Sequence, residues 1–583
     1  MKKILSIAVL CFVALAINAV PAKRGWHTVA QPDGTTVEVQ QMGDEFYHYW
    51  IDKEGREVRK NAEGVFEVVG QAPTAAEFKA RRANTKIQRA RRVQKADGFG
   101  YTPYLPPKGV VIMANFKDRT FKSTTTKAVI DEMCNSTNCT VNKYNGKNYG
   151  SLAQYFRDQS DNKYSIQLDV YGPVTLSQNS SYYGGNDSQG NDSHPANAVI
   201  EACTLANEEI DFSQYDWNND GEVDFVYVVY AGIGEADAGT STAAQNSIWP
   251  HSYEIESARY YGDCTYTKAQ CKFDGKYVNC YAMSNELSGT SLAGIGIIAH
   301  EFGHVIGLPD HYDTDYSTNY NNSLTPNEWD IMDGGSYNGG IHCPPNYNTW
   351  EKYFFGWYTP ENLGSNGAKL TLKAIGTEGY NSYQVNASGK LQTATTTGLN
   401  YYFENRQKQG WDTYLPAAGL VIWKVNYNKT MWENNGPNLT SNGDPHFTLV
   451  PSSGTAIGED YGTKNVFPYG SVNSWSGVSG KPLKDITRSG TNITLTYIEE
   501  PVDPKYTVTW IVNGTQIEQQ EYAIDGSENL VLPTATVTPC EGTEFIGWTA
   551  ESEWFDPFEN PADLFTTASG KVTNDATYRA VFK

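Results

Sequence analysis

The pattern of apolar and polar positions changes several times along the 583-residue chain. Residues 23–97 carry short alternating runs, which are typical of half-buried strands. Residues 98–362 mix apolar strand-like runs with amphipathic segments of helical period, which predicts strands and helices together. Short alternating runs return over 363–500, where their spacing predicts a β-sandwich, and again over 505–583. The chain is therefore predicted to be a multidomain protein of the α+β class.

The mixed region contains the clearest individual elements. A continuous apolar run over 110–115 predicts a buried strand, and Ser151 is placed to cap a helix that begins after it. A mostly apolar run from residue 291 predicts a buried helix that ends near Gly307, because glycine adopts the left-handed conformation at helix ends and Pro309 cannot continue a helix. The remaining predictions there are strands over 164–176, 223–231 and 276–282 and helices over 195–208 and 350–357.

The first residues have the pattern of a secretory leader. Two lysines follow the initiator methionine, an apolar run covers 4–16, and Ala19 and Ala22 offer small residues for cleavage. We therefore predict a signal peptide over 1–22 and a secreted protein, either free or associated with the cell surface. The apolar run is too short to cross a membrane comfortably, and no transmembrane segment is predicted. The alternative is that this run remains as an N-terminal anchor.

Charge is distributed unevenly along the chain. The formal net charge is −21, but residues 1–97 hold 16 Lys/Arg and 11 Asp/Glu, so residues 98–583 carry a net charge of −26. An acidic protein of this kind is not expected to bind nucleic acid or an anionic membrane. The composition suits an extracellular protein that coordinates calcium.

A basic polar run at 79–92 separates the first region from the rest of the chain. Together they predict a propeptide over 23–97 with an exposed processing segment. The alternative is a solvated basic helix that joins two permanent domains. If the region does block a metal centre, His27, His48 or an acidic side chain could do so.

Eight cysteines follow the predicted leader, and an even number in an exported chain predicts disulfides. Cys134 with Cys139, and Cys264 with Cys271, are close enough in sequence to form local bridges. No CxxC pair is present, so a cysteine-based zinc site is not expected. The other four lie at Cys203, Cys280, Cys343 and Cys540.

The strongest chemical signal is a His-Glu-x-x-His motif in the predicted buried helix. His300 and His304 are four residues apart and project from one face, so both imidazoles can reach one zinc ion. Glu301 follows the first histidine, and its carboxylate can lie beside the metal and accept a proton from the attacking water. The alternative is a buried helix with two satisfied histidines.

The turn after this helix is expected to return to the metal. Asp310 lies six residues past His304, at the offset where related patterns place a third ligand. His311 and Asp313 are neighbours that could compete for that role.

A glycine-rich turn follows 28 residues after the second histidine. Met332 in the run Trp-Asp-Ile-Met-Asp-Gly-Gly suits a Met-turn, the hydrophobic base below the zinc. Tyr337 lies five residues further on and is a candidate electrophilic helper, with a packing tyrosine as the alternative. The methionine could likewise be an ordinary core residue.

A second metal-binding pattern lies upstream. Oxygen-bearing side chains occur at loop positions 1, 3, 5 and 9 with glycine at 6, and position 7 offers its backbone carbonyl, as in calcium loops. Position 12 is a tyrosine, so the bidentate glutamate is missing and another segment or water must complete the shell. The predicted calcium residues are Asp216, Asn218, Asp220, Glu222 and Asp224, and the alternative is a hydrated acidic turn.

The combination His-Glu-Phe-Gly-His-x-x-Gly-Leu-Pro-Asp with the later Trp-Asp-Ile-Met-Asp-Gly-Gly resembles the immune inhibitor A-like family of secreted zinc metallopeptidases. The likeness covers roughly residues 105–500. It implies a metzincin-like catalytic domain over 98–362, endopeptidase activity, one catalytic zinc and bound calcium. By the same resemblance, His300, His304 and Asp310 would be zinc ligands and Glu301 the general base.

Residues 505–583 look like one internalin-type β-grasp repeat, a surface module whose ligand could be a surface component or a glycan. The resemblances together predict a monomeric zinc endopeptidase acting on protein or peptide substrates. One alternative is a binding or adhesion protein in which the metal-binding region is a vestigial scaffold. Another is a zinc hydrolase that acts on a different amide or ester, because the motif defines the attacking water but not the acyl group.

Overall fold

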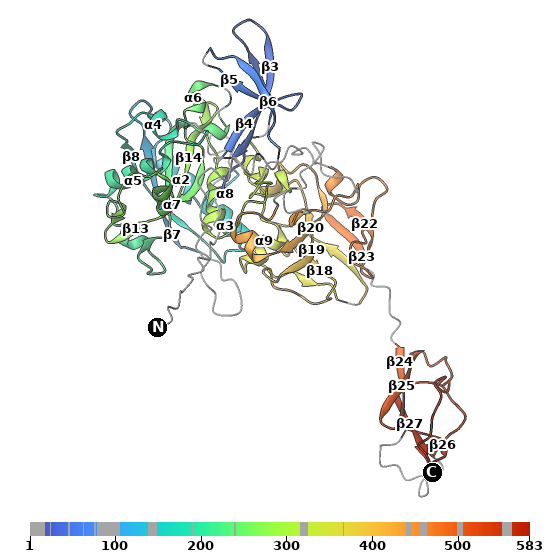
Figure 1. Cartoon of the computed structure of the whole chain (residues 1–583). Coiled ribbons are helices and arrows are strands. Elements are labelled where there is room, and N and C mark those ends of the chain that lie inside the picture. The colour runs from blue at the N-terminus through green and yellow to red at the C-terminus, as the bar shows by residue number, and fades with distance from the viewer. Residues whose placement is uncertain are drawn as a thin grey trace, which may run out of the picture. The chain divides into compact units, whose positions relative to one another are not determined.

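The computed structural model forms two compact units (Figure 1). The first contains residues 1–364, 369–478 and 483–496, and the second contains 365–368, 479–482 and 497–583. The structure describes residues 18–23, 25–44, 47–61, 63–74, 77, 105–137, 149–187, 190–237, 239, 241–314, 325–364, 366–438, 445–453, 463–497, 505–550 and 563–583. Most of the predicted leader, the basic run at 79–92 and Cys139 lie outside these residues.

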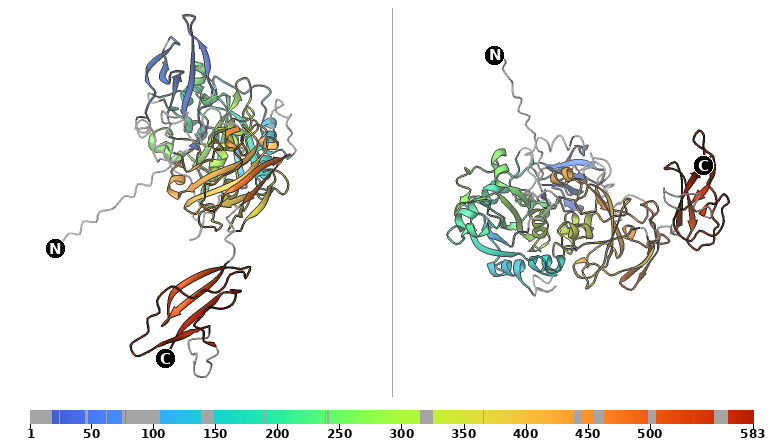
Figure 2. Two further views of the ribbon diagram at one scale, coloured as in Figure 1. Left: turned by 90° about the vertical axis from the view of Figure 1, so that its right-hand side faces the viewer. Right: turned by 90° about the horizontal axis from the view of Figure 1, so that it is seen from below.

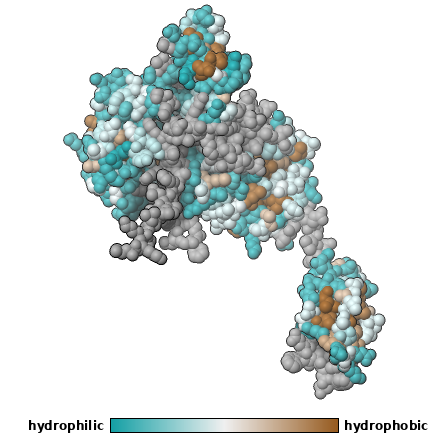
Figure 3. Space-filling view, viewed as in Figure 1, coloured by the Kyte–Doolittle hydropathy of each residue, from teal (hydrophilic) through white to brown (hydrophobic). Residues whose placement is uncertain are grey.

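The N-terminal region forms an antiparallel meander. Its alternating runs build a sheet of order β2-β3-β4-β5-β6 around a small core of Val39, Trp50, Val58 and Phe66. Figure 3 shows a patch of apolar side chains on this sheet. A second small cluster joins Met42 to Tyr312, so the sheet packs against the segment that follows the metal-binding motif. The strands are β2 (His27–Ala30), β3 (Thr36–Asp44), β4 (Tyr47–Asp52), β5 (Arg56–Lys60) and β6 (Phe66–Gln71).

A mixed sheet of order β1-β11-β14-β10-β7-β8 forms the centre of the first unit, with β15 also paired to β14. Strands β14, β10, β7 and β8 run parallel, whereas β11 is antiparallel to β14. The very short β1 pairs antiparallel with β11 at the edge. The bounds are β1 (Asn18–Ala19), β7 (Lys108–Asn115), β8 (Gln167–Thr175), β10 (Val226–Ile233), β11 (His251–Glu254), β14 (Cys280–Ser288) and β15 (Ser291–Leu292).

Each parallel strand serves two cores because successive side chains point to opposite faces of the sheet. Val111 and Met113 of β7 contribute to one cluster, which also includes residues of α2, α3 and α8. Val110 and Ile112 contribute to the other, which includes α5. The helices are α2 (Lys127–Asn135), α3 (Leu152–Gln159), α4 (Ser180–Gly184), α5 (Pro195–Ala206), α6 (Thr242–Gln245), α7 (Ile255–Tyr261), α8 (Gly296–Val305) and α9 (Thr349–Phe354).

Most predicted elements of this region are present, and α3 begins at the predicted cap: the Ser151 side chain accepts from the backbone N–H of Gln154. The helix predicted from residue 291 begins later, because residues 291 and 292 pair with β14 as β15. The strand predicted over 276–282 is divided between β13 (Lys276–Val278) and β14. The helix predicted over 350–357 is the shorter α9, which ends before Gly356, a residue with φ of +69°.

Two further sheets occupy the region from 361 to 497, where a β-sandwich is predicted. One has the order β16-β18-β19-β20-β21, the other β17-β23-β22. Asn405 of β19 links them, since its side chain donates to the carbonyls of Leu372 and Thr491. Figure 2 shows these strands in yellow and orange. The bounds are β16 (Glu361–Asn362), β17 (Ala368–Leu372), β18 (Tyr383–Val385), β19 (Gly398–Arg406), β20 (Gly419–Tyr427), α10 (Lys429–Glu433), β21 (Phe447–Leu449), β22 (Leu483–Ser489) and β23 (Asn492–Tyr497).

The second unit is a small sheet of order β25-β24-β27-β26 around Trp510 and Trp548. Strands β24 and β27 run parallel. Its described residues contain no α-helix, so the predicted β-grasp likeness remains a prediction. The strands are β24 (Lys505–Val512), β25 (Thr515–Ala523), β26 (Phe545–Thr549) and β27 (Ala576–Phe582).

Two sequence predictions concern the chain as a whole. Within the described ranges, no helix has the length and apolar character needed to cross a membrane. No disulfide joins any two of the cysteines that the structure describes, so the predicted disulfides are not confirmed. Cys264 and Cys271 are both buried.

Candidate metal centre

The two histidines of α8 turn their Nε2 atoms toward each other. His300 donates from Nδ1 to the carbonyl of Ile331 at 2.7 Å, and His304 donates from Nδ1 to the carbonyl of Leu308 at 2.8 Å. These bonds orient both rings and leave the two Nε2 atoms, 3.1 Å apart, as the atoms that could bind a metal. The arrangement is the one expected of two imidazoles prepared for one metal.

Asp310 completes this group. Its Oδ1 lies 3.4 Å from Nε2 of His300 and 3.3 Å from Nε2 of His304, and all three residues are 0% exposed. A tetrahedral zinc with bonds of about 2.0–2.1 Å holds its ligand atoms about 3.3 Å apart. The donor set and its spacing therefore fit zinc. Glu301, also 0% exposed, follows His300 in the helix.

The electrostatics of the group favour a positive charge at its centre. Burial disfavours a charged His300, but the hydrogen bond with Asp310 and the charge of Glu301 outweigh it and raise the pKa of His300 to about 9. Burial would also raise the pKa of Asp310, yet the two imidazoles hold that pKa well below its ordinary value. A divalent cation would satisfy the same demand.

Asn435, just after α10, holds Asp310 in position, and sequence reasoning did not identify it. Its Nδ2 donates to Oδ2 of Asp310 at 2.6 Å, while its Oδ1 accepts from the Asp310 backbone N–H at 2.6 Å. This clamp leaves Oδ1 of Asp310 to face the histidines. No local pattern could reveal it, because the two residues are 125 positions apart.

The two rivals for the third position lie elsewhere. His311 directs Nδ1 to Oδ2 of Asp330 at 2.9 Å, and Oε1 of Glu351 is 3.8 Å from the same nitrogen. These three residues form a second buried group whose geometry could hold a metal. Asp313 is buried but belongs to neither group among the residues described.

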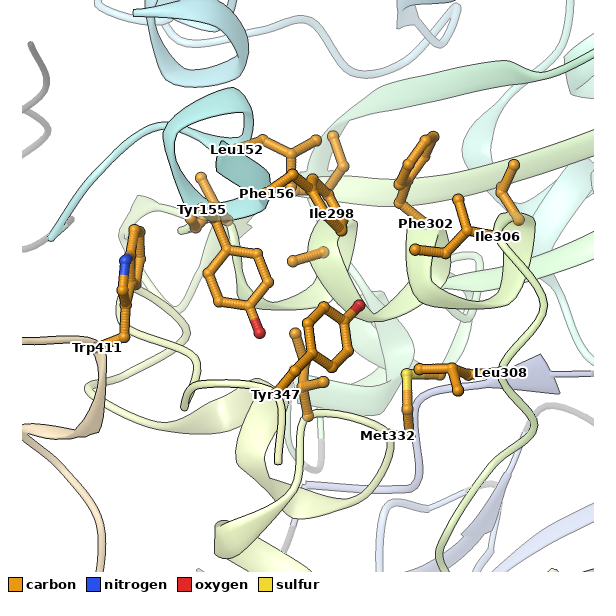
Figure 4. Packing of buried hydrophobic residues seen from close by; sticks show 14 of the residues in the cluster. Leu152, Tyr155, Phe156, Ile298, Phe302, Ile306, Leu308, Met332, Tyr347 and Trp411 are labelled. Atoms are coloured by element: carbon orange, nitrogen blue, oxygen red, sulfur yellow. The ribbon is translucent and has the colours of Figure 1, made fainter. Parts of the chain in front are cut away.

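Met332 lies against the helix, as a Met-turn residue would. A β-carbon placed on Gly303 would meet its sulfur at 2.6 Å, so the glycine between the two histidines is what allows the close approach. Figure 4 shows Met332 with Leu308 beside it, below the turn of α8 that carries Phe302. The methionine is completely buried.

Tyr337 contacts the N-terminal segment. Its hydroxyl donates to the carbonyl of Pro21 at 2.7 Å, and the indole N–H of Trp249 donates to the carbonyl of Val20 at 3.1 Å. Residues 18 and 19 pair with β11 at the edge of the central sheet. The segment therefore lies extended along an edge strand, in the manner of a bound peptide.

Neither histidine proposed as a zinc blocker joins the metal-binding group. His48 forms an ion pair with Glu235, its Nε2 lying 3.2 Å from Oε1. His27 packs edge-on against Trp50 within the N-terminal sheet.

A lysine forms an ion pair with the first carboxylate of the predicted calcium loop. Lys276 places Nζ 2.7 Å from Oδ2 of Asp216, and the same carboxylate accepts from the backbone N–H groups of Asp220 and Gly221. Oδ2 of Asp224 accepts from the backbone N–H of Trp217. Among the described residues, the acidic side chains of this loop are not gathered into a group that could hold a metal, and calcium binding by the loop remains a prediction.

Comparison with known proteins agrees with this geometry. Residues 114–364 match the family model described as immune inhibitor A peptidase M6, catalytic domain. This part of the chain is similar to the peptidase M6 catalytic domain. The matched region includes α8, Asp310 and the Met332 turn, and it covers most of the region predicted to be catalytic, 98–362.

Two curated relatives are similar to part of this chain. The pre-pro-metalloprotease PrtV of Vibrio cholerae serotype O1 is 31% identical over 257 residues, which is 40% of this chain and 27% of PrtV. Immune inhibitor A of Bacillus thuringiensis subsp. alesti is 26% identical over 245 residues, 39% of this chain and 34% of that relative. The alignments thus cover about a quarter to a third of the length of these relatives.

Proposed function

We propose that the chain is an exported zinc-dependent endopeptidase. The observation that carries the proposal is the set of three buried ligand atoms, Nε2 of His300, Nε2 of His304 and Oδ1 of Asp310, which lie 3.1–3.4 Å from one another. A domain homologous to metalloproteases contains all three. The N-terminal lysines and apolar run support export.

Zinc held by these residues would lower the pKa of a bound water toward neutrality and polarise the scissile carbonyl. In this mechanism Glu301 would accept the proton of the attacking water and pass it to the leaving amine. The hydrogen bonds of both histidines to backbone carbonyls fix the rings, and Asn435 fixes Asp310. Tyr337 remains a candidate helper, because its hydroxyl already donates to a peptide carbonyl at 2.7 Å.

The test is cleavage of a peptide library by the zinc-loaded protein, followed by mass spectrometry with and without a chelator. Internal peptide bonds should be cut, the chelator should stop cleavage, and added zinc should restore it. Cleavage that resists the chelator would contradict the metal's role. Binding without cleavage would favour an adhesion protein, and hydrolysis of simple esters alone would favour a different zinc hydrolase.

We also propose that residues 23–97 act as a propeptide. The supporting observations are the complete burial of His300, Glu301 and Asp310 in the full chain and the packing of the N-terminal sheet against Tyr312. A substrate needs access to these groups, so the covering parts must move before peptide cleavage.

The ion pair of His48 makes this packing dependent on pH. Burial alone would lower the pKa of His48, but Glu235 and Asp44 outweigh it and raise the pKa above 6.5. The stabilisation is therefore complete below pH 6.5 and is lost as the pH rises through the raised value. Amide hydrogen exchange over 36–52, corrected for its intrinsic pH dependence, should accelerate over that range.

His48→Gln is the control for this prediction. The variant has no titrating imidazole, so its corrected exchange should not show the step. An identical step in both proteins would assign the pH dependence to another group.

Calcium binding by the loop at 216–224 is expected from the sequence alone. The loop spacing supports it, whereas the contact between Lys276 and Asp216 places an ammonium group on the first carboxylate of the loop. A calcium ion bound there would require Lys276 to move.

A further inference from the structure

A small buried polar cluster, which we call the recess, lies beside β11, the strand with which residues 18 and 19 pair. Glu235, in the turn after β10, is 2% exposed, and its Oε1 accepts from Nδ2 of Asn186 at 3.0 Å. Trp249, just before β11, forms the aromatic wall. The occupant is the imidazole of His48, which comes from the N-terminal sheet.

The occupant is held as a cation. Nε2 of His48 lies 3.2 Å from Oε1 of Glu235, and Nδ1 lies 3.2 Å from the carbonyl of Asp44, so both ring nitrogens face acceptors. The ring stacks on Trp249 with centroids 4.7 Å apart and an interplanar angle of 26°. A carboxylate beside an aromatic face is a site for a planar positive group.

The recess contains a hydrogen-bond acceptor that His48 does not use. Oε2 of Glu235 is buried and has no hydrogen-bond partner within the described part of the chain. A buried carboxylate without a counter-charge is costly, so removal of His48 would leave a strong preference for another cation. A guanidinium group could engage both carboxylate oxygens and stack on the indole at the same time.

The recess also adjoins β11, the strand with which residues 18 and 19 pair. Trp249, whose face contacts His48, uses its indole N–H to bind the carbonyl of Val20. The same side chain packs with Ile297 of α8, one turn before His300. A peptide extended along β11 in place of residues 18–22 would therefore pass next to the recess.

We infer that Glu235 and Trp249 form a substrate subsite for an arginine or lysine side chain, which His48 occupies in the uncleaved chain. The inference rests on the proposed peptidase function and specifies part of its substrate class. This chain itself contains a matching sequence, since seven of the fourteen residues at 79–92 are arginine or lysine.

 The seven basic residues of that run are Lys79, Arg81, Arg82, Lys86, Arg89, Arg91 and Arg92.

The test compares peptides that carry arginine with otherwise identical peptides that carry citrulline, its uncharged isostere. The full chain is expressed, allowed to process, loaded with zinc and assayed on peptides with the 79–92 sequence, with each arginine replaced in turn. At one position, kcat/KM should be about tenfold or more higher for arginine, as expected for a charge-assisted hydrogen bond. Glu235→Gln should reduce this ratio to near one, and Glu235→Lys should shift the preference to glutamate at the same position.

The ratio is measured within one enzyme sample, so loss of folded protein cancels. Glu208→Gln is the matched control, because it removes one negative charge from an exposed position of the same unit and should keep the ratio. Cleavage of neutral peptides with no position that prefers arginine would overturn the subsite and leave the peptidase intact. A zinc-loaded chain that cleaves no peptide would overturn both.

Discussion

Glu301→Gln is expected to keep the fold and the zinc but to lose peptide cleavage. Glutamine has nearly the same shape as glutamate, yet its amide cannot accept the proton of the attacking water. Loss of a general base costs about 10²–10⁴-fold in rate. We therefore expect kcat/KM for casein or a fluorogenic peptide to fall by about a thousandfold, with zinc content, measured by mass spectrometry, close to that of the parent.

The control for this variant is Glu209→Gln, which removes one negative charge from an exposed position. It should cleave at the parental rate. If zinc-loaded Glu301→Gln retains substantial casein hydrolysis, the general base is another group.

Asp310→Ala is expected to release the metal. The substitution removes the carboxylate oxygen that lies 3.4 Å from Nε2 of His300 and 3.3 Å from Nε2 of His304. Changing a group that merely supports a ligand weakens metal binding by about 10–100-fold, and loss of the ligand itself should cost more. Competition with a chromophoric chelator should show zinc affinity reduced by at least about 100-fold, with activity lost in parallel.

His311→Ala tests whether the third zinc ligand is Asp310 or His311. His311 faces Asp330 and Glu351, so its loss should weaken the fold more than the affinity for catalytic zinc. Full zinc content in Asp310→Ala together with loss of zinc in His311→Ala would move the third ligand to His311.

Local patterns were sufficient for the parts of this site that lie close together in sequence. The four-residue spacing of the histidines is a property of any helix, and Gly307 does adopt a positive φ, +112°, where the helix ends. The buried strand at 110–115 was predicted from its apolar run and is the main part of β7. Such features depend on a few neighbouring residues, which is why the sequence alone could predict them.

The parts that sequence could not predict depend on distant contacts. The start of the metal-binding helix was placed too early because the pairing of β15 with β14 competes with helix formation there. Asn435 and Glu235 belong to no sequence motif. Their proposed roles depend on Asp310 and His48, which folding brings next to them. The choice among Asp310, His311 and Asp313 likewise required the direction of each side chain.

The clamp on Asp310 has a consequence for where the peptidase ends. The family match stops at residue 364, but Asn435 lies well beyond it. A shortened chain ending at 364 would retain both imidazoles and lose the amide that orients the carboxylate. We therefore expect a chain that ends at residue 364 to retain zinc more weakly than the full chain, because it lacks the segment between β20 and β21 that carries Asn435.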